Sequence, residues 1–77
     1  MSSMRSSNVL EDGVYLAKCR ERSALAAAAN GHGAVWPEAR MVIAKGTARF
    51  YRGNEQVWLC NAAYAGAQFE VTQVSPG

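Results

Sequence analysis

The single histidine is the residue of this sequence best suited to acid–base chemistry. His32 stands between Gly31 and Gly33, and a general base needs a partner group in a held geometry. No serine, cysteine or aspartate close by in the sequence supplies that partner. We therefore expect a solvent-exposed loop histidine, and the sequence predicts no catalytic residue.

The two cysteines lack the spacing of a metal site. Cys19 and Cys60 are separated by 40 residues, and a zinc site would need both thiols, His32 and a carboxylate. The glycines around His32 form too short a segment to hold a phosphate, and they follow a predicted helix where phosphate loops precede one. The sequence predicts neither a metal nor a cofactor.

A cluster of basic and aromatic residues is the stronger functional signal. In the predicted strand 48–52, the two-residue period places Arg49 and Tyr51 on one face and Phe50 and Arg52 on the other. Arginine and aromatic side chains anchor protein interfaces and also stack on bases. The alternative is that Phe50 and Trp58 are core residues and that the arginines protect an edge strand from aggregation. The predicted partner-binding residues are Trp36, Lys45, Arg49, Tyr51, Arg52 and Trp58.

Length and charge limit the function classes. A chain of 77 residues allows one domain, and such a domain buries roughly 60% of the surface that its unfolded chain exposes, which argues against a deep catalytic cleft. The net charge of +2 is mild for a nucleic-acid-binding protein. No apolar run approaches the ~20 residues of a membrane helix. The first residues also lack a signal peptide, so we expect a cytoplasmic protein with reduced thiols and no membrane contact.

The first half of the sequence predicts an arm, a strand and a helix. Residues 1–8 are rich in serine and predict a flexible arm, so that residues 9–77 form the domain. A strand over residues 14–17 follows a turn signal. The alanine-rich segment 20–30 predicts a helix that Asn30 and Gly31 end. Because its side chains are small, we expect this helix to lie close against a sheet.

The second half predicts strands. Residues 40–44, 48–52 and 57–60 are apolar or β-branched, and a four-residue connection, 53–56, is typical of a hairpin. Residues 61–66 are small and turn-like, and residues 68–74 alternate as a half-buried strand does. The predicted order is β-α-β-β-β-β, an α+β fold with a mostly antiparallel sheet and one helix on one face.

Several strand residues carry a family resemblance: Glu38-Ala39-Arg40-Met41, Gly46, Phe50-Tyr51-Arg52 and Val57-Trp58-Leu59. They resemble the C-terminal part of the RNA 2′-phosphotransferase family, and the strand over 14–17 followed by a helix is similar to that family's Val-His-Leu-Ser strand. The likeness covers about residues 14–59. It implies an ADP-ribosyltransferase-like fold that uses NAD to remove an RNA 2′-phosphate. The family's N-terminal half, with a catalytic arginine and histidine, has no counterpart here, so no active-site residue is carried over.

The sequence as a whole favours a small non-catalytic protein that binds and modulates or inhibits a macromolecular partner. Compact inhibitors that phages and mobile elements use against host defence, such as anti-CRISPR proteins, have this size. The mild positive charge favours an acidic protein partner. Three alternatives stay open: an NAD-dependent RNA 2′-phosphotransferase or ADP-ribosyltransferase-like fragment, a small nucleic-acid-binding module, and a homodimer paired through an edge strand.

Overall fold

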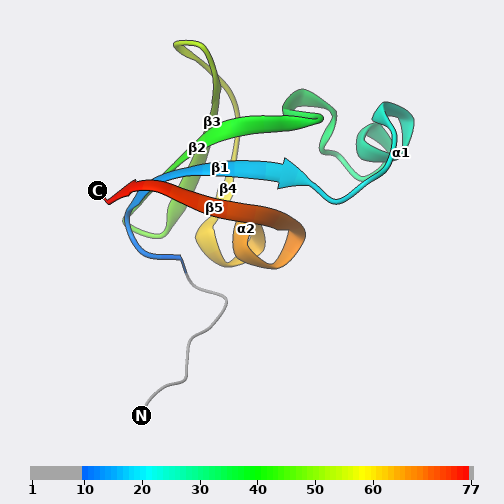
Figure 1. Ribbon diagram of the computed structural model, residues 1–77. Coiled ribbons are helices and arrows are strands. Elements are labelled where there is room, and N and C mark those ends of the chain that lie inside the picture. The colour runs from blue at the N-terminus through cyan, green and yellow to red at the C-terminus, as the bar shows by residue number, and fades with distance from the viewer. Residues whose placement is uncertain (1–9, 77) are drawn as a thin grey trace.

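Five strands and two helices follow one another in the computed structural model, which describes residues 10–76. The predicted arm, residues 1–8, lies outside the described residues. The elements, shown in Figure 1, are β1 (Gly13–Cys19), α1 (Ala24–Ala29), the 3₁₀ turn η1 (Gly33–Val35), β2 (Glu38–Ala44), β3 (Thr47–Arg52), β4 (Glu55–Asn61), α2 (Ala62–Gln68) and β5 (Phe69–Pro76).

The strands form one sheet in the order β4-β3-β2-β1-β5, and every neighbouring pair is antiparallel. This confirms the predicted α+β fold. The β3–β4 connection is shorter than predicted, because Arg52 pairs with Glu55 and Tyr51 with Gln56. Gly53 has a φ of +61°, and glycine in that conformation allows a two-residue hairpin turn.

Alternate residues of the strands face the interior. Phe50, Phe69 and Met41 are the largest of the fully buried side chains. Residues beside them in sequence point the other way, as the two-residue period of a strand requires. The core contains Tyr15, Ala17, Cys19, Val35, Ala39, Met41, Ile43, Ala48, Phe50, Ala62, Ala65 and Phe69.

The alanine-rich helix α1 is shorter than predicted, and it does not lie against the sheet. It begins after Ser23, whose hydroxyl accepts a hydrogen bond from the Ala26 amide at 3.1 Å, and it ends at Asn30 as predicted. Its main neighbour is η1, at the far end of β1 (Figure 1). Ala27 is buried, but Leu25 is 81% exposed. A helix of alanines has no wide apolar face to cover a sheet, so the prediction that it packs there is wrong.

A second helix, α2, covers residues 62–68, although the sequence predicts residues 61–66 to be turn-like and a strand to begin at residue 68. The Asn61 side chain accepts a hydrogen bond from the Tyr64 amide at 2.7 Å and so satisfies one of the free donors of the first turn. Ala62 and Ala65, three residues apart on one face, are buried against the core. The helix that covers the sheet interior is therefore α2, packed on β3, β4 and β5.

Candidate functional site

His32 is buried, contrary to the prediction of an exposed loop residue. After α1 the chain reverses at Gly31, which has a φ of +83°, and the His32 amide donates to the Ala27 carbonyl at 2.7 Å. The imidazole lies inside the molecule and is only 1% exposed. Its centroid is 4.8 Å from that of Phe69 and 5.6 Å from that of Trp58. These aromatic rings, which come from distant parts of the sequence, exclude water from it.

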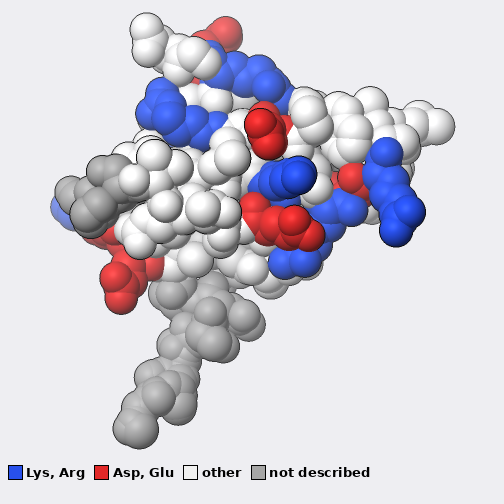
Figure 2. Space-filling view, in the orientation of Figure 1, with Lys and Arg blue, Asp and Glu red and all other residues white. Residues whose placement is uncertain are grey.

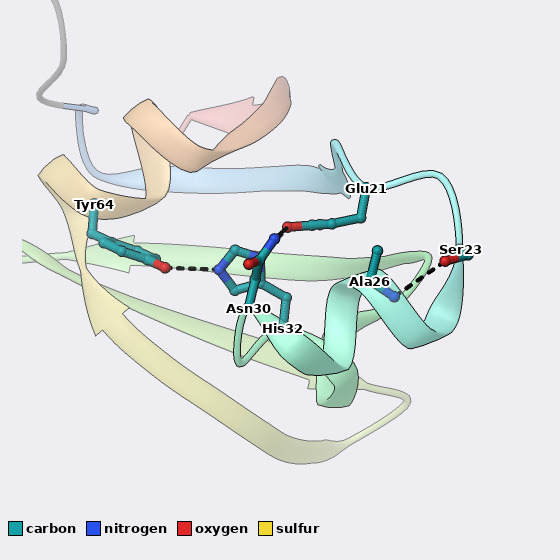
Figure 3. A network of polar contacts seen from close by, with 6 residues as sticks. All are labelled: Glu21, Ser23, Ala26, Asn30, His32 and Tyr64. Carbon is teal, nitrogen blue, oxygen red and sulfur yellow. Dashed lines mark hydrogen bonds and ion pairs between the residues drawn. The ribbon is translucent and has the colours of Figure 1, made fainter.

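Both ring nitrogens of His32 have a polar partner. Nδ1 lies 2.9 Å from Oε2 of Glu21, and Nε2 lies 2.7 Å from the Tyr64 hydroxyl (Figure 3). A neutral imidazole satisfies both contacts when Nδ1–H donates to the carboxylate and Nε2 accepts from the phenol. We call this chain of contacts the Glu21–His32–Tyr64 network.

Glu21 forms the end of the network opposite Tyr64. Its side chain is 10% exposed, and Oε2 also accepts a hydrogen bond from Nδ2 of Asn30 at 2.8 Å. The Asn30 hydrogen bond is the main cause that holds the pKa of the Glu21 carboxyl below its ordinary value, and His32 contributes while burial opposes the change. The other oxygen, Oε1, is buried and has no hydrogen-bond partner among the described residues. Glu21 is thus an ionised carboxylate that orients the imidazole.

A carboxylate, an imidazole and a hydroxyl in this order have the geometry of an oriented base beside a nucleophile. Tyr64 as a whole residue is 37% exposed, which makes it the most exposed member of the network. No spacing in the sequence marks this site, because its members lie 11 and 32 residues apart. They meet only through tertiary packing, and Tyr64 lies on α2, a helix that the sequence does not predict.

The six predicted partner-binding residues do not form one surface. Arg49 and Tyr51 lie on the exposed face of the sheet, whereas Trp58 pairs with Phe50 on the interior side. Arg52 is also on that side, where its guanidinium donates to the carbonyls of Ala34 (3.4 Å) and Trp36. It holds the β1–β2 connection in place. Trp36 itself packs against the core, and Lys45 stands in the β2–β3 turn.

The exposed face of the sheet carries two adjacent cross-strand rows. The first row runs through Leu59, Arg49, Val42 and Val14. The second runs through Tyr51, Arg40, Leu16 and Thr72. We define the outer face as Val14, Leu16, Arg40, Val42, Arg49, Tyr51 and Leu59.

The outer face combines apolar area with unpaired positive charge. Leu59 is 55% exposed. The Arg40 guanidinium lies 4.8 Å from the centroid of the Tyr51 ring and donates to the Gly53 carbonyl at 2.9 Å. Neither Arg40 nor Arg49 forms an ion pair with another described residue. Figure 2 shows Lys and Arg side chains beside the β3–β4 turn, next to a broad area without charge.

The thiols and the remaining ligand-type residues stay apart. Cys19 and Cys60 are free cysteines, and burial raises the pKa of Cys60 to about 11. Within residues 10–76, no three side chains of the metal-binding types come together. No helix in the same part of the chain has the length and apolar character needed to cross a membrane.

Comparison with protein-family models, with curated proteins and with solved structures finds no match to this chain. The fold defines a small α+β domain with one antiparallel sheet. Its two candidate sites, the outer face and the Glu21–His32–Tyr64 network, are therefore defined by their own geometry.

Proposed function

We propose that this protein is a small binding module that docks on an acidic protein partner through the outer face. The observation that supports the proposal is the composition of the two cross-strand rows. Arg49 lies between Leu59 and Val42, and Arg40 lies between Tyr51 and Leu16. Two guanidinium groups that form no ion pair among the described residues, each between apolar or aromatic side chains, favour a partner that offers carboxylates beside apolar side chains.

A protein partner is favoured over a nucleic acid by the placement of the aromatic rings. Single-stranded nucleic acids stack their bases on exposed aromatic side chains. Tyr51 is the aromatic residue of the outer face, and the Arg40 guanidinium already lies over its ring. Phe50 is fully buried and Trp58 is half-buried on the interior side. The outer face offers leucine and valine in place of a stacking platform, which suits a protein interface.

A domain of this kind would act by occupying its partner's surface. Arginine and tyrosine are, with tryptophan, the residue types enriched at interface hot spots, and energetically near-neutral contacts around them exclude water. We expect Arg49 and Tyr51 to be such anchors, with Leu59 and Leu16 around them. Modulation or inhibition of the partner follows from the occupied surface and needs no catalysis.

The proposal is tested by capture followed by a measured affinity. The immobilised protein is incubated with host lysate, the retained protein is identified and purified, and its Kd is measured by calorimetry. Arg49→Glu reverses the charge in the first row, and we expect it to weaken binding at least about tenfold, or ~1.4 kcal/mol. Leu59→Glu should act in the same direction.

The matched control is Arg22→Glu, the same change at an exposed residue between β1 and α1, outside the sheet. It should leave the Kd within about twofold. Equal weakening by Arg22→Glu and Arg49→Glu would show a general charge effect and remove the outer face from the proposal. A retained species that nuclease digestion releases would replace the protein partner with a nucleic acid.

A further inference from the structure

The Glu21–His32–Tyr64 network lies apart from the outer face and has a chemistry of its own. We propose that the Tyr64 hydroxyl is an activated nucleophile that accepts an acyl group from a reactive ester. His32 is the general base of this reaction, and Glu21 is the positioning residue that holds His32. This activity is independent of the binding function proposed above.

The distances fit a nucleophile with an oriented base. Contacts of 2.7 Å from Nε2 to the Tyr64 oxygen and of 2.9 Å from Nδ1 to Glu21 both fall in the range of such arrangements. The imidazole cannot turn away, because it is buried and packed among the rings of Trp58, Tyr64 and Phe69. The base is therefore aligned before any ester arrives.

The backbone that carries the nucleophile is also held in place. Tyr64 stands in the first turn of α2, where its amide donates to Oδ1 of Asn61. Figure 3 shows its side chain directed from α2 toward His32. His32 is buried, the Glu21 side chain is 10% exposed and Tyr64 is 37% exposed, so Tyr64 is the member of the network that an ester approaching from solvent meets first.

The other two tyrosines of the described chain provide internal comparisons. Tyr15 is buried, and its hydroxyl donates to the Glu11 carbonyl at 2.7 Å. Tyr51 is half-buried beneath the Arg40 guanidinium. Neither hydroxyl contacts an imidazole among the described residues. One chain thus contains three phenols, of which Tyr64 has a base.

The step is a simple acyl transfer. The phenol proton of Tyr64 moves to Nε2 of His32 as the phenol oxygen attacks the carbonyl carbon of the ester. The bond between that carbon and the leaving oxygen then breaks, and the leaving alkoxide or aryl oxide takes the proton back from the imidazolium. The products are O-acyl-Tyr64 and a free alcohol or phenol. Glu21 stabilises the imidazolium formed on the way.

The groups around His32 are mostly uncharged. Glu21 precedes α1 and Tyr64 belongs to α2, while Trp58 of β4 and Phe69 of β5 contribute uncharged rings. Cys19 of β1 is near enough for the Glu21 charge to add to burial in raising the pKa of its thiol. Cys19 therefore stays protonated near neutral pH and adds no charge beside Glu21, although the Arg52 charge opposes the effect of Glu21 on this thiol.

The test uses the purified full chain and p-nitrophenyl acetate. Intact mass measures acetylation, and peptide mapping separates Tyr64 from Tyr51, Tyr15 and the amines. We expect Tyr64 to react at least tenfold faster than Tyr51, a lower bound set below the about 10²–10⁴-fold that a well-placed general base contributes. Tyr64→Phe should remove this acetylation, and Glu21→Gln should slow it about tenfold.

The ratio of the Tyr64 rate to the Tyr51 rate separates base assistance from a structural effect. Tyr51 reports any general change in the folded protein, and Glu21→Gln should lower the ratio only if Glu21 positions the base. Equal rates at Tyr64 and Tyr51 would overturn the proposal, as would a Tyr64 rate that Glu21→Gln leaves unchanged. His32→Gln is an additional variant, and if circular dichroism shows that it does not fold, the rate ratio in the original chain and Glu21→Gln still decide.

Discussion

His32 and Tyr64 are joined by a contact of 2.7 Å between Nε2 and the phenol oxygen, across 32 residues of the chain. This contact ties the segment that follows α1 to α2, two parts of the fold that the sheet does not connect directly. Glu21 extends the connection back to the end of β1. The long excursion between β1 and β2 is thus anchored by polar groups within an apolar interior, where an unpaired polar group is costly.

Replacing His32 tests how strongly this anchor stabilises the fold. His32→Leu puts an apolar side chain of similar volume in place of the imidazole and removes both buried hydrogen bonds. We expect the free energy of unfolding to fall by about 2 kcal/mol, since each such bond contributes ~1 kcal/mol. Urea unfolding followed by tryptophan fluorescence measures it. Tyr64→Phe, which removes one bond, should cost about half as much, and a His32→Leu variant as stable as the original chain would contradict this role.

The Glu21 carboxyl should make the free energy of unfolding depend on pH in the acidic range. Its folded-state pKa lies below its ordinary value of 4.5, mainly through the Asn30 hydrogen bond. A carboxyl of this kind binds its proton more readily in the unfolded chain. Its contribution to stability is therefore complete above about pH 4.5 and is lost as the pH falls through the folded-state pKa.

Glu21→Gln isolates that contribution. The difference in unfolding free energy between the original chain and the variant should be largest near pH 7 and should shrink as the pH is lowered toward 3. Urea titrations at a series of pH values measure both proteins under the same conditions. A difference that stays constant down to pH 3 would mean that the carboxyl does not titrate with folding. Glu70→Gln, on the exposed pair with Arg20, is the control and should change little.

The sheet was predictable because its signal is local. Alternation within six residues of β3 identifies Ala48 and Phe50 as buried and Arg49 as exposed, and the same period predicts Phe69 and Glu70 on opposite faces of β5. The end of α1 at Asn30 followed from the usual termination of a helix before glycine. These properties depend on neighbours in sequence, so they can be obtained from the sequence alone.

The network was not predictable because its signal is not local. An imidazole flanked by two glycines has the sequence environment of an exposed residue, and only the packed fold brings Glu21 and Tyr64 to it. The missed α2 has the same origin, since its small residues give little apolar pattern until Ala62 and Ala65 meet the core. The phosphotransferase resemblance, the acidic partner and self-association through an edge strand stay predictions.

The Asn61 cap is expected to stabilise α2. Its side-chain oxygen accepts from the Tyr64 amide, and loss of such a cap costs ~1 kcal/mol. Asn61→Ala should lower the free energy of unfolding by about that amount, measured by urea unfolding. Asn61→Asp keeps the acceptor and is the matched control. If the two variants were equally destabilised, the capping hydrogen bond would not be the cause.

We expect the Cys60 thiol to be alkylated slowly in the folded protein. Burial raises its pKa to about 11 from the ordinary 9.0, and the thiolate is the form that reacts. At pH 8 about one thiol in a thousand is then ionised, against about one in ten in the unfolded chain, so iodoacetamide should react about 100-fold more slowly before any steric effect. The rate should rise tenfold for each pH unit between 8 and 10. Mass spectrometry of the Cys60 peptide, with and without urea, measures both rates, and similar rates in the two conditions would show that the folded thiol is not protected.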